Sequence, residues 1–197
     1  MSDERIWQAK LAARIHDPAE KALVLLRDPA GHEGGTVRTL REKLFPSDAW
    51  GWVEAIVKKA DHWASAADRP QFPREKDDNL FARWAQVRFT EAPELKHPLT
   101  GGSFNLKTLQ EIDFEQVKAV SGDHFENLIQ YEGEIINWKK TVLAFWRFGP
   151  ELGGEGLRLL WQLLPADTRV PDHTIWSHLD LASALAGAIA GDAQGTP

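Results

Sequence analysis

Histidine and aspartate residues at scattered positions in this sequence have the chemistry to hold a divalent cation. His16 and Asp17 are adjacent just before Pro18, while Asp61 and His178 stand among apolar residues. The chain has no cysteine. Disulfides, thiolate sites and cysteine nucleophiles are therefore excluded, and a metal must be held by imidazole and carboxylate. Water activated on such a cation can attack a phosphodiester.

Each of these residues also has an ordinary structural interpretation. His178 shares a helical face with Leu181, Ala182 and Leu185. An imidazole on such a face either bonds a carbonyl group or binds a metal, because an unpaired buried polar group is costly. Asp61 lies at the border of an apolar stripe, where its carboxylate is either exposed and ion-paired or desolvated and coordinated. The pattern predicts that both residues are ligands, with these alternatives open.

His32 is a further candidate ligand, because it lies in the glycine-rich loop 28–35, where a side chain can turn inward. A solvated loop histidine is the alternative, and the loop lacks the lysine and spacing of a phosphate-binding loop. Taken alone, the pair at 16–17 also fits surface or capping residues. His62, Asp68 and Asp172 are secondary candidates for metal ligation. Asp68 can instead form an ion pair, and Asp172 can instead cap the N-terminus of a helix.

The elements that must position these side chains are helices, which makes the predicted fold class all-α. Apolar spacing and end signals predict helices over 4–16, 19–26, 36–45, about 47–67, 124–146, 151–164 and 173–190. Prolines and glycines interrupt residues 69–122, where 80–87 fits a helix and 87–90 a strand. We expect one domain over 1–190, with an irregular insertion at about 75–135 and a disordered tail at 191–197.

The nine tryptophans are an unusual feature of this composition. Trp52, Trp63, Trp138 and Trp146 fall inside apolar helical patterns, which predicts that they pack in the core. The alternative is a set of base-stacking platforms, which requires exposed aromatic rings beside basic groups.

Charge and hydropathy limit the class of protein. The net charge of −6 argues against a protein that coats nucleic acid with its whole surface, but a local basic groove remains compatible with it. No apolar run approaches the roughly 18 residues of a membrane span, and the N-terminus lacks the layout of a signal peptide. We therefore expect a cytoplasmic protein without a membrane partner.

Several longer strings resemble one family. They are KLAARIHDPAEK at 10–21, GHEGGT at 31–36, ADHWASAADRP at 60–70, LLPADTR at 163–169 and PDHTIWSHLDLASALA at 171–186. Together they look like the N-terminal histidine–aspartate (HD) domain of the large, polymerase-like subunit of type III-B CRISPR-Cas (Cmr) effector complexes. The last string is the most specific.

This resemblance implies a circularly permuted HD fold and a named metal site. The permuted order places the first motif histidine on His178, the His-Asp pair on His16 and Asp17, the loop histidine on His32 and the closing aspartate on Asp61. The implied catalytic residues are the His-Asp pair. Mn or Mg is the expected cofactor, and Ni, Co or Zn also suits these ligands.

The resemblance further implies metal-dependent cleavage of single-stranded DNA in antiviral defence. The expected partners are other Cmr subunits and the palm domains of the large subunit, with CRISPR RNA and target RNA as indirect partners. The polymerase-like Gly-Gly-Asp-Asp motif is absent from this sequence. Two alternatives stay open at this stage: a degenerate HD module that serves as a docking unit, and a free-standing HD phosphohydrolase acting on a nucleotide.

Overall fold

A computed structural model describes residues 2–17, 36–45, 47–68, 94–96, 100–105, 123–149, 166 and 173–192. Its helices are α1 (Ser2–Arg14), α3 (Thr36–Leu44), α4 (Ser47–Asp68), α7 (Trp138–Phe148) and α9 (Ile175–Asp192). Two antiparallel hairpins pair β1 (Glu94–Lys96) with β2 (Ser103–Asn105) and β3 (Tyr131–Glu132) with β4 (Ile135–Ile136). Helices dominate, which confirms the all-α class. The helices expected at 19–26, 80–87 and 151–164 and the strand at 87–90 lie outside the described residues.

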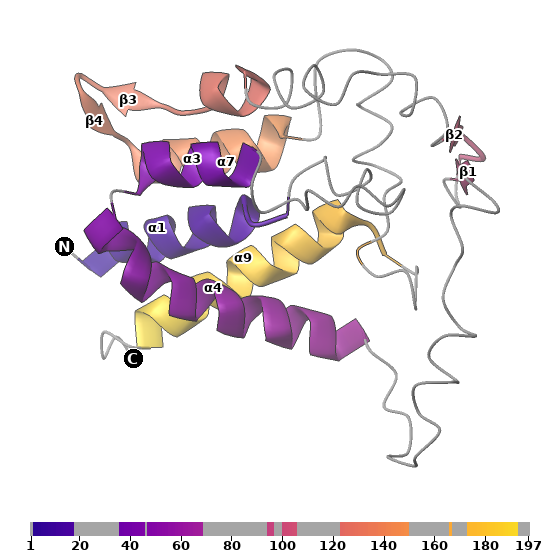
Figure 1. Ribbon diagram of the computed structural model, residues 1–197, viewed down its shortest axis with the longest axis horizontal. Coiled ribbons are helices and arrows are strands. Elements are labelled where there is room, and N and C mark those ends of the chain that lie inside the picture. The colour runs from indigo at the N-terminus through magenta and orange to yellow at the C-terminus, as the bar shows by residue number, and fades with distance from the viewer. Residues whose placement is uncertain are drawn as a thin grey trace.

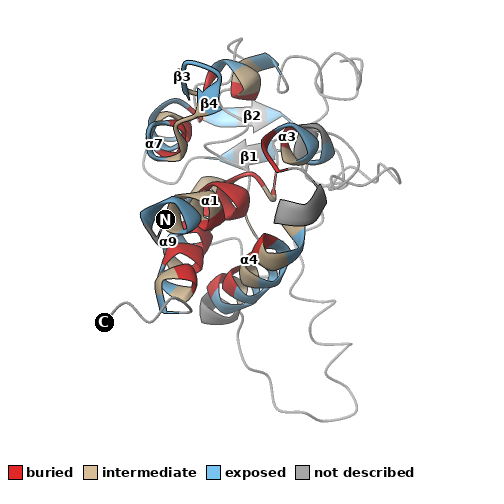
Figure 2. Cartoon of the chain, turned by 90° about the vertical axis from the view of Figure 1, so that its left-hand side faces the viewer, coloured by how far each residue is buried: buried red, intermediate tan, exposed pale blue. Residues whose placement is uncertain are grey.

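Helix α1 is the central element of the helical bundle. It contacts α9, α7 and α4, and α4 in turn packs on α9 (Figure 1). Figure 2 shows α7 and α4 on different sides of α1, with buried residues lining the facing surfaces. The end of α1 therefore lies where other helices can supply side chains to it.

Helices α1 and α9 pack antiparallel along a seam of small residues. The Ser183 hydroxyl donates to the Lys10 carbonyl over 2.9 Å, and a Cβ on Gly187 would meet the Lys10 side chain at 2.8 Å. Small side chains let two helices approach closely, so the end of α1 meets the beginning of α9. In the part of the chain that the structure describes, no helix combines the length and apolarity needed to cross a membrane.

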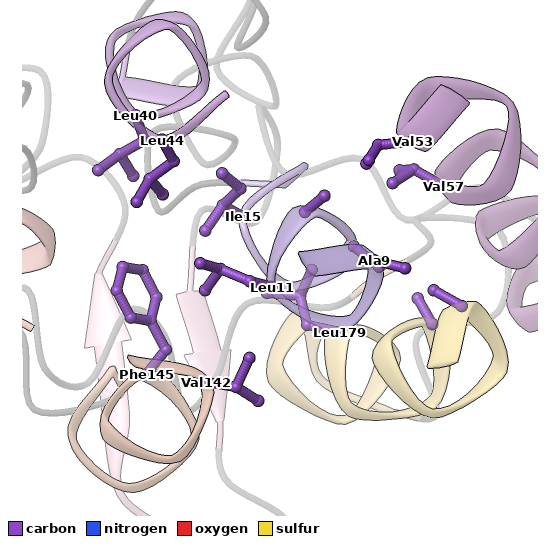
Figure 3. Close-up of a cluster of buried hydrophobic side chains, with 14 of the residues drawn as sticks. Ala9, Leu11, Ile15, Leu40, Leu44, Val53, Val57, Val142, Phe145 and Leu179 are labelled. Carbon is purple, nitrogen blue, oxygen red and sulfur yellow. The ribbon is translucent and has the colours of Figure 1, made fainter. Parts of the chain in front are cut away.

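The core also joins α1 to α7 and α4. Figure 3 shows Leu11 pointing toward Val142 and Phe145 of α7, while Val53 and Val57 point from α4 toward α1. All five side chains are buried. Burial of such side chains stabilises each contact by about 1.5–3 kcal/mol per residue, which holds α1 in place between its neighbours.

The helix predicted over 124–146 is wrong, because the structure interrupts it with a hairpin. Residues 123–127 are helical, the β3–β4 hairpin follows, and α7 begins only at Trp138. Gly133 has φ of +64° and permits the two-residue turn between the strands. Asn137 then caps α7 by accepting a hydrogen bond from the Lys140 backbone N–H over 2.9 Å.

Two tryptophans expected in the core are half-exposed instead. Trp52 and Trp138 pack against the core as predicted. Trp63 is 48% exposed and Trp146 is 52% exposed, because each lies at the solvent edge of its helix. Leu181, expected beside His178, is also exposed. The spacing of apolar residues predicts that these residues lie near the core face of their helices. It does not show which edge of that apolar face a neighbouring element covers.

Candidate metal centre

Four of the five predicted ligands meet where three helices converge. His16 and Asp17 follow the end of α1, Asp61 lies on α4 and His178 lies in the first turns of α9. The residue before a proline avoids the helical conformation, and Pro18 follows this pair. The backbone leaves the helix at this point, so both side chains can face one position although helical neighbours would diverge by about 100°.

The ligand atoms lie at distances that suit one cation. Asp61 Oδ1 lies 3.0 Å from Nε2 of His178 and 3.5 Å from Nε2 of His16. His16 Nε2 is 3.7 Å from Asp17 Oδ2, and one ligand atom each from His16, Asp17 and His178 lies within 4.8 Å of the others. Ligands held about 2.1 Å from a metal are separated by at most about 4.2 Å, so small side-chain adjustments would bring these atoms within reach of one cation.

Burial separates an inner and an outer side of the cluster. Asp17 and His178 are each 5% exposed, and His16 is half-buried. The Asp61 side chain is 34% exposed, so solvent reaches the cluster beside α4. A water molecule can therefore approach on the Asp61 side, while Asp17 and His178 stay shielded.

The orientation of His16 favours a positive charge between the side chains. Its Nδ1 donates to the Ala13 carbonyl, which turns Nε2 toward the carboxylates of Asp17 and Asp61. This buried Nε2 has no hydrogen-bond partner within the described residues. A nitrogen lone pair facing two carboxylates is repelled unless a proton or a metal ion lies between them. The donor set therefore fits a divalent cation.

The same geometry changes the acid–base properties of the cluster. Burial disfavours the charged imidazole, but the neighbouring Asp61 carboxylate, the charge of Asp17 and the Ala13 carbonyl outweigh it and raise the pKa of His16. Burial also disfavours the charged Asp61. The close approach of the two imidazoles outweighs it and holds the pKa of that carboxyl well below its usual range. The raised pKa therefore keeps a proton on His16, between the two carboxylates, to higher pH.

We expect the metal-free protein to lose stability as pH rises. The folded pKa of His16 lies above its unfolded value of about 6.5, so its stabilisation is complete below that pH and is lost as pH rises through the folded pKa. Urea unfolding in EDTA should show the free energy of unfolding falling above about pH 6.5. His16→Gln should reduce that fall, whereas His62→Gln should keep the wild-type profile. Coincident profiles for wild type and His16→Gln would contradict this assignment.

The remaining candidates are not part of the described cluster. His62 is adjacent to Asp61 but exposed, so it faces away from the ligands. His32 and Asp172 lie outside the described residues, as does the side chain of Asp68 at the end of α4. Their assignments stay predictions.

Two neighbouring features were missed from the sequence. Arg14 is 6% exposed and forms an ion pair with Asp180, which joins the end of α1 to α9 beside the cluster. The ring centroid of His173 lies 6.3 Å from that of His178. Arg14 lies in the string at 10–21, and His173 and Asp180 lie in the string at 171–186. A basic residue before the His-Asp pair and an acidic residue after His178 were the sequence signals for the ion pair.

The N-cap of α9 is Thr174, so the cap expected at Asp172 is wrong, because the helix begins at Ile175 and not at residue 173. Its hydroxyl accepts a hydrogen bond from the Ser177 backbone N–H over 3.3 Å, and the His178 backbone N–H donates to the Thr174 carbonyl over 3.1 Å. This first turn fixes where the His178 imidazole leaves the helix. A threonine before an apolar helical pattern is the sequence signal for such a cap.

Comparisons with known proteins give a short but close similarity. No protein-family model matches the chain. No solved structure matches it either. A stretch of 22 residues is 82% identical to the CRISPR system Cmr subunit Cmr2 of Pyrococcus furiosus. This stretch is 11% of the present chain and spans 2% of that subunit. Over this segment, the chain is similar to a Cmr subunit.

Proposed function

We propose that this chain is a metal-dependent HD nuclease domain of a type III-B CRISPR effector large subunit that cleaves single-stranded DNA. The observation that carries the proposal is the meeting of His16, Asp17, Asp61 and His178, with a buried imidazole nitrogen facing two carboxylates. The short identity to a Cmr subunit supports the family context. Its partners would then be other Cmr subunits, the palm domains and, indirectly, CRISPR RNA and target RNA.

The side chains divide into holding and orienting roles in this proposal. His16, Asp17 and His178 would hold the cation, with Mn²⁺ or Mg²⁺ expected and Ni²⁺, Co²⁺ or Zn²⁺ compatible. When bound, the cation supplies charge neutralisation for the phosphodiester and acidifies water. Asp61 is partly exposed and deprotonated beside the two imidazoles. Its carboxylate can therefore contact the cation and accept a hydrogen bond from the attacking water.

We expect the purified chain to cleave labelled single-stranded DNA with Mn²⁺ and to lose this activity in EDTA. Asp17→Asn removes a buried ligand charge with little change in volume, so the rate should fall by about 100-fold or more. Gel analysis of single-stranded DNA, single-stranded RNA and nucleotides in parallel measures the rate and the preferred substrate. Asp123→Asn, which changes an exposed aspartate outside the cluster, should retain the wild-type rate.

The assay separates the proposed nuclease from its alternatives. Cleavage that survives both the chelator and Asp17→Asn would overturn a metal-dependent mechanism. Hydrolysis of nucleotides alone would favour a free-standing phosphohydrolase. Metal binding without cleavage would favour a docking module of the Cmr complex. Asp17 and His178 are deeply buried, so they can stabilise the fold without contacting a substrate.

A further inference from the structure

Helix α7 is apolar on both of its sides. Its inner side buries Val142 and Phe145 against the core, as expected of an amphipathic helix. Its outer side leaves Leu143 46% exposed and Trp146 52% exposed, and Phe148 at its end is 45% exposed. Side chains of this size on the solvent side of a helix mark an interaction surface when they are contiguous.

Leu143 and Trp146 form a ridge between two grooves. One groove, of about 600 Å³, runs between this ridge and the segment of Leu128 and Gln130. The other, of about 420 Å³, runs between the ridge and α1 and α9, where Ser183 lines it. Both grooves are lined by Leu143 and Trp146. A ridge of this kind, flanked by two grooves, is the surface on which another helix packs its own side chains.

Cations surround this ridge although the chain carries a net charge of −6. The Nζ atoms of Lys10 and Lys139 lie 5.3 and 5.7 Å from the ring centroid of Trp7, and the Arg147 guanidinium lies 6.0 Å from that of Phe148. Within the described part of the chain, none of these three cations forms an ion pair.

Two acidic groups of this region are already engaged with other cations, and one of them, Asp180, lines the second groove. Glu132 pairs with Lys140 over 2.8 Å, and Asp180 pairs with Arg14. The rim of the α7 face is therefore positive, so an occupant with negative flanks is electrostatically favoured.

We propose that the α7 face, defined by Leu143, Trp146, Phe148, Lys139 and Arg147, binds an amphipathic helix of another protein that carries acidic residues beside its apolar stripe. The two grooves receive the apolar side chains of that helix, and the rim cations pair with its carboxylates. This inference does not depend on the metal centre.

A second copy of this chain and a nucleic acid fit the face less well. Two α7 faces would bring Lys139 and Arg147 of one copy against the same cations of the other, which is unfavourable. Nucleic-acid strands bind by stacking bases on aromatic rings. Here the grooves are lined in part by the aliphatic Leu128, Leu143 and Ala144, which suit protein side chains instead.

Fluorescence anisotropy with a designed peptide tests the proposal. The probe is a labelled helical peptide of about 18 residues, with leucines at positions i, i+3, i+4 and i+7 and flanking glutamates. A matched peptide carries lysines in place of the glutamates. We expect the full chain to bind the glutamate peptide about tenfold more tightly than the lysine peptide. Equal affinity for the two peptides would overturn the proposal.

Variants locate the binding on α7. Trp146→Ala should lower the affinity for the glutamate peptide about 30-fold, because an exposed aromatic anchor is lost without disturbing the core. The double variant Lys139→Glu with Arg147→Glu should invert the preference, so that the lysine peptide binds more tightly.

A matched site on α4 provides the control. Trp63 is 48% exposed and Lys59 Nζ lies 4.7 Å from its ring centroid, on a helix that packs on another side of α1 (Figure 2). Trp63→Ala and Lys59→Glu should leave both affinities unchanged, and an equal loss in these variants would contradict the location. An oligothymidine that displaces the peptide, and whose own binding is lost in Trp146→Ala, would show that the face binds nucleic acid and overturn the protein partner.

Discussion

Replacing His178 by alanine is expected to lower the affinity of the chain for Mn²⁺ by about 100-fold. Removing a residue that merely supports a metal ligand already costs about 10–100-fold, and in the proposed centre His178 supplies a ligand atom itself. Its Nε2 also lies 3.0 Å from Asp61 Oδ1, so the variant loses the group that orients this carboxylate. Isothermal titration calorimetry at constant pH measures the dissociation constant directly.

His62→Ala is the matched control for this experiment. His62 lies beside Asp61 on α4 but is exposed, so its removal should leave the affinity unchanged. Circular dichroism of both variants shows whether the helices are retained, and His178→Gln provides a polar replacement if alanine destabilises α9. An unaltered affinity in folded His178 variants would mean that the two ends of the chain do not share a cation, and the permuted assignment would be wrong.

Phe145→Ala should lower the free energy of unfolding by about 3–5 kcal/mol. Phe145 is 1% exposed, and its ring stacks on that of Phe125 with centroids 5.5 Å apart. It also faces Leu11 of α1 (Figure 3). Alanine leaves a cavity where α7 meets α1, and the surrounding side chains fill such a cavity only in part. Urea unfolding at 25 °C, followed by far-ultraviolet circular dichroism, measures the change.

Phe148→Ala on the same helix removes the same side chain from an exposed position. Phe148 is 45% exposed, so the free energy of unfolding should change by less than about 1 kcal/mol. Comparable losses for Phe145→Ala and Phe148→Ala would contradict the buried position of Phe145 and, with it, the packing of α7 on α1.

The sequence predicted the helices that carry the site because their signals are local. The spacing of apolar residues and the end signals placed helices at 4–16, at about 47–67 and at 173–190, close to the observed α1, α4 and α9. Asp61 and His178 were recognisable because each interrupts an apolar face with a group that must be paired or coordinated. Their observed contact over 3.0 Å agrees with that requirement.

Other features depend on tertiary contacts that spacing does not reveal. Residues 124–146 follow a helical apolar pattern, yet the turn at Gly133 and the cap at Asn137 divide them. The positions of Trp63 and Trp146 depended on which edge of each helix a neighbour covers. The orientation of the His16 ring depended on its contact with the Ala13 carbonyl, which exists only once the chain leaves α1.

The antiparallel seam between α1 and α9 also orders events during biosynthesis. Ribosomes deliver His16, Asp17 and Asp61 early, but His178 emerges only after more than a hundred further residues, since it lies 117 positions beyond Asp61. A nascent or prematurely released polypeptide thus lacks one member of the proposed metal centre. Translation itself delays the assembly of the centre until the last helix is available to fold back on the first.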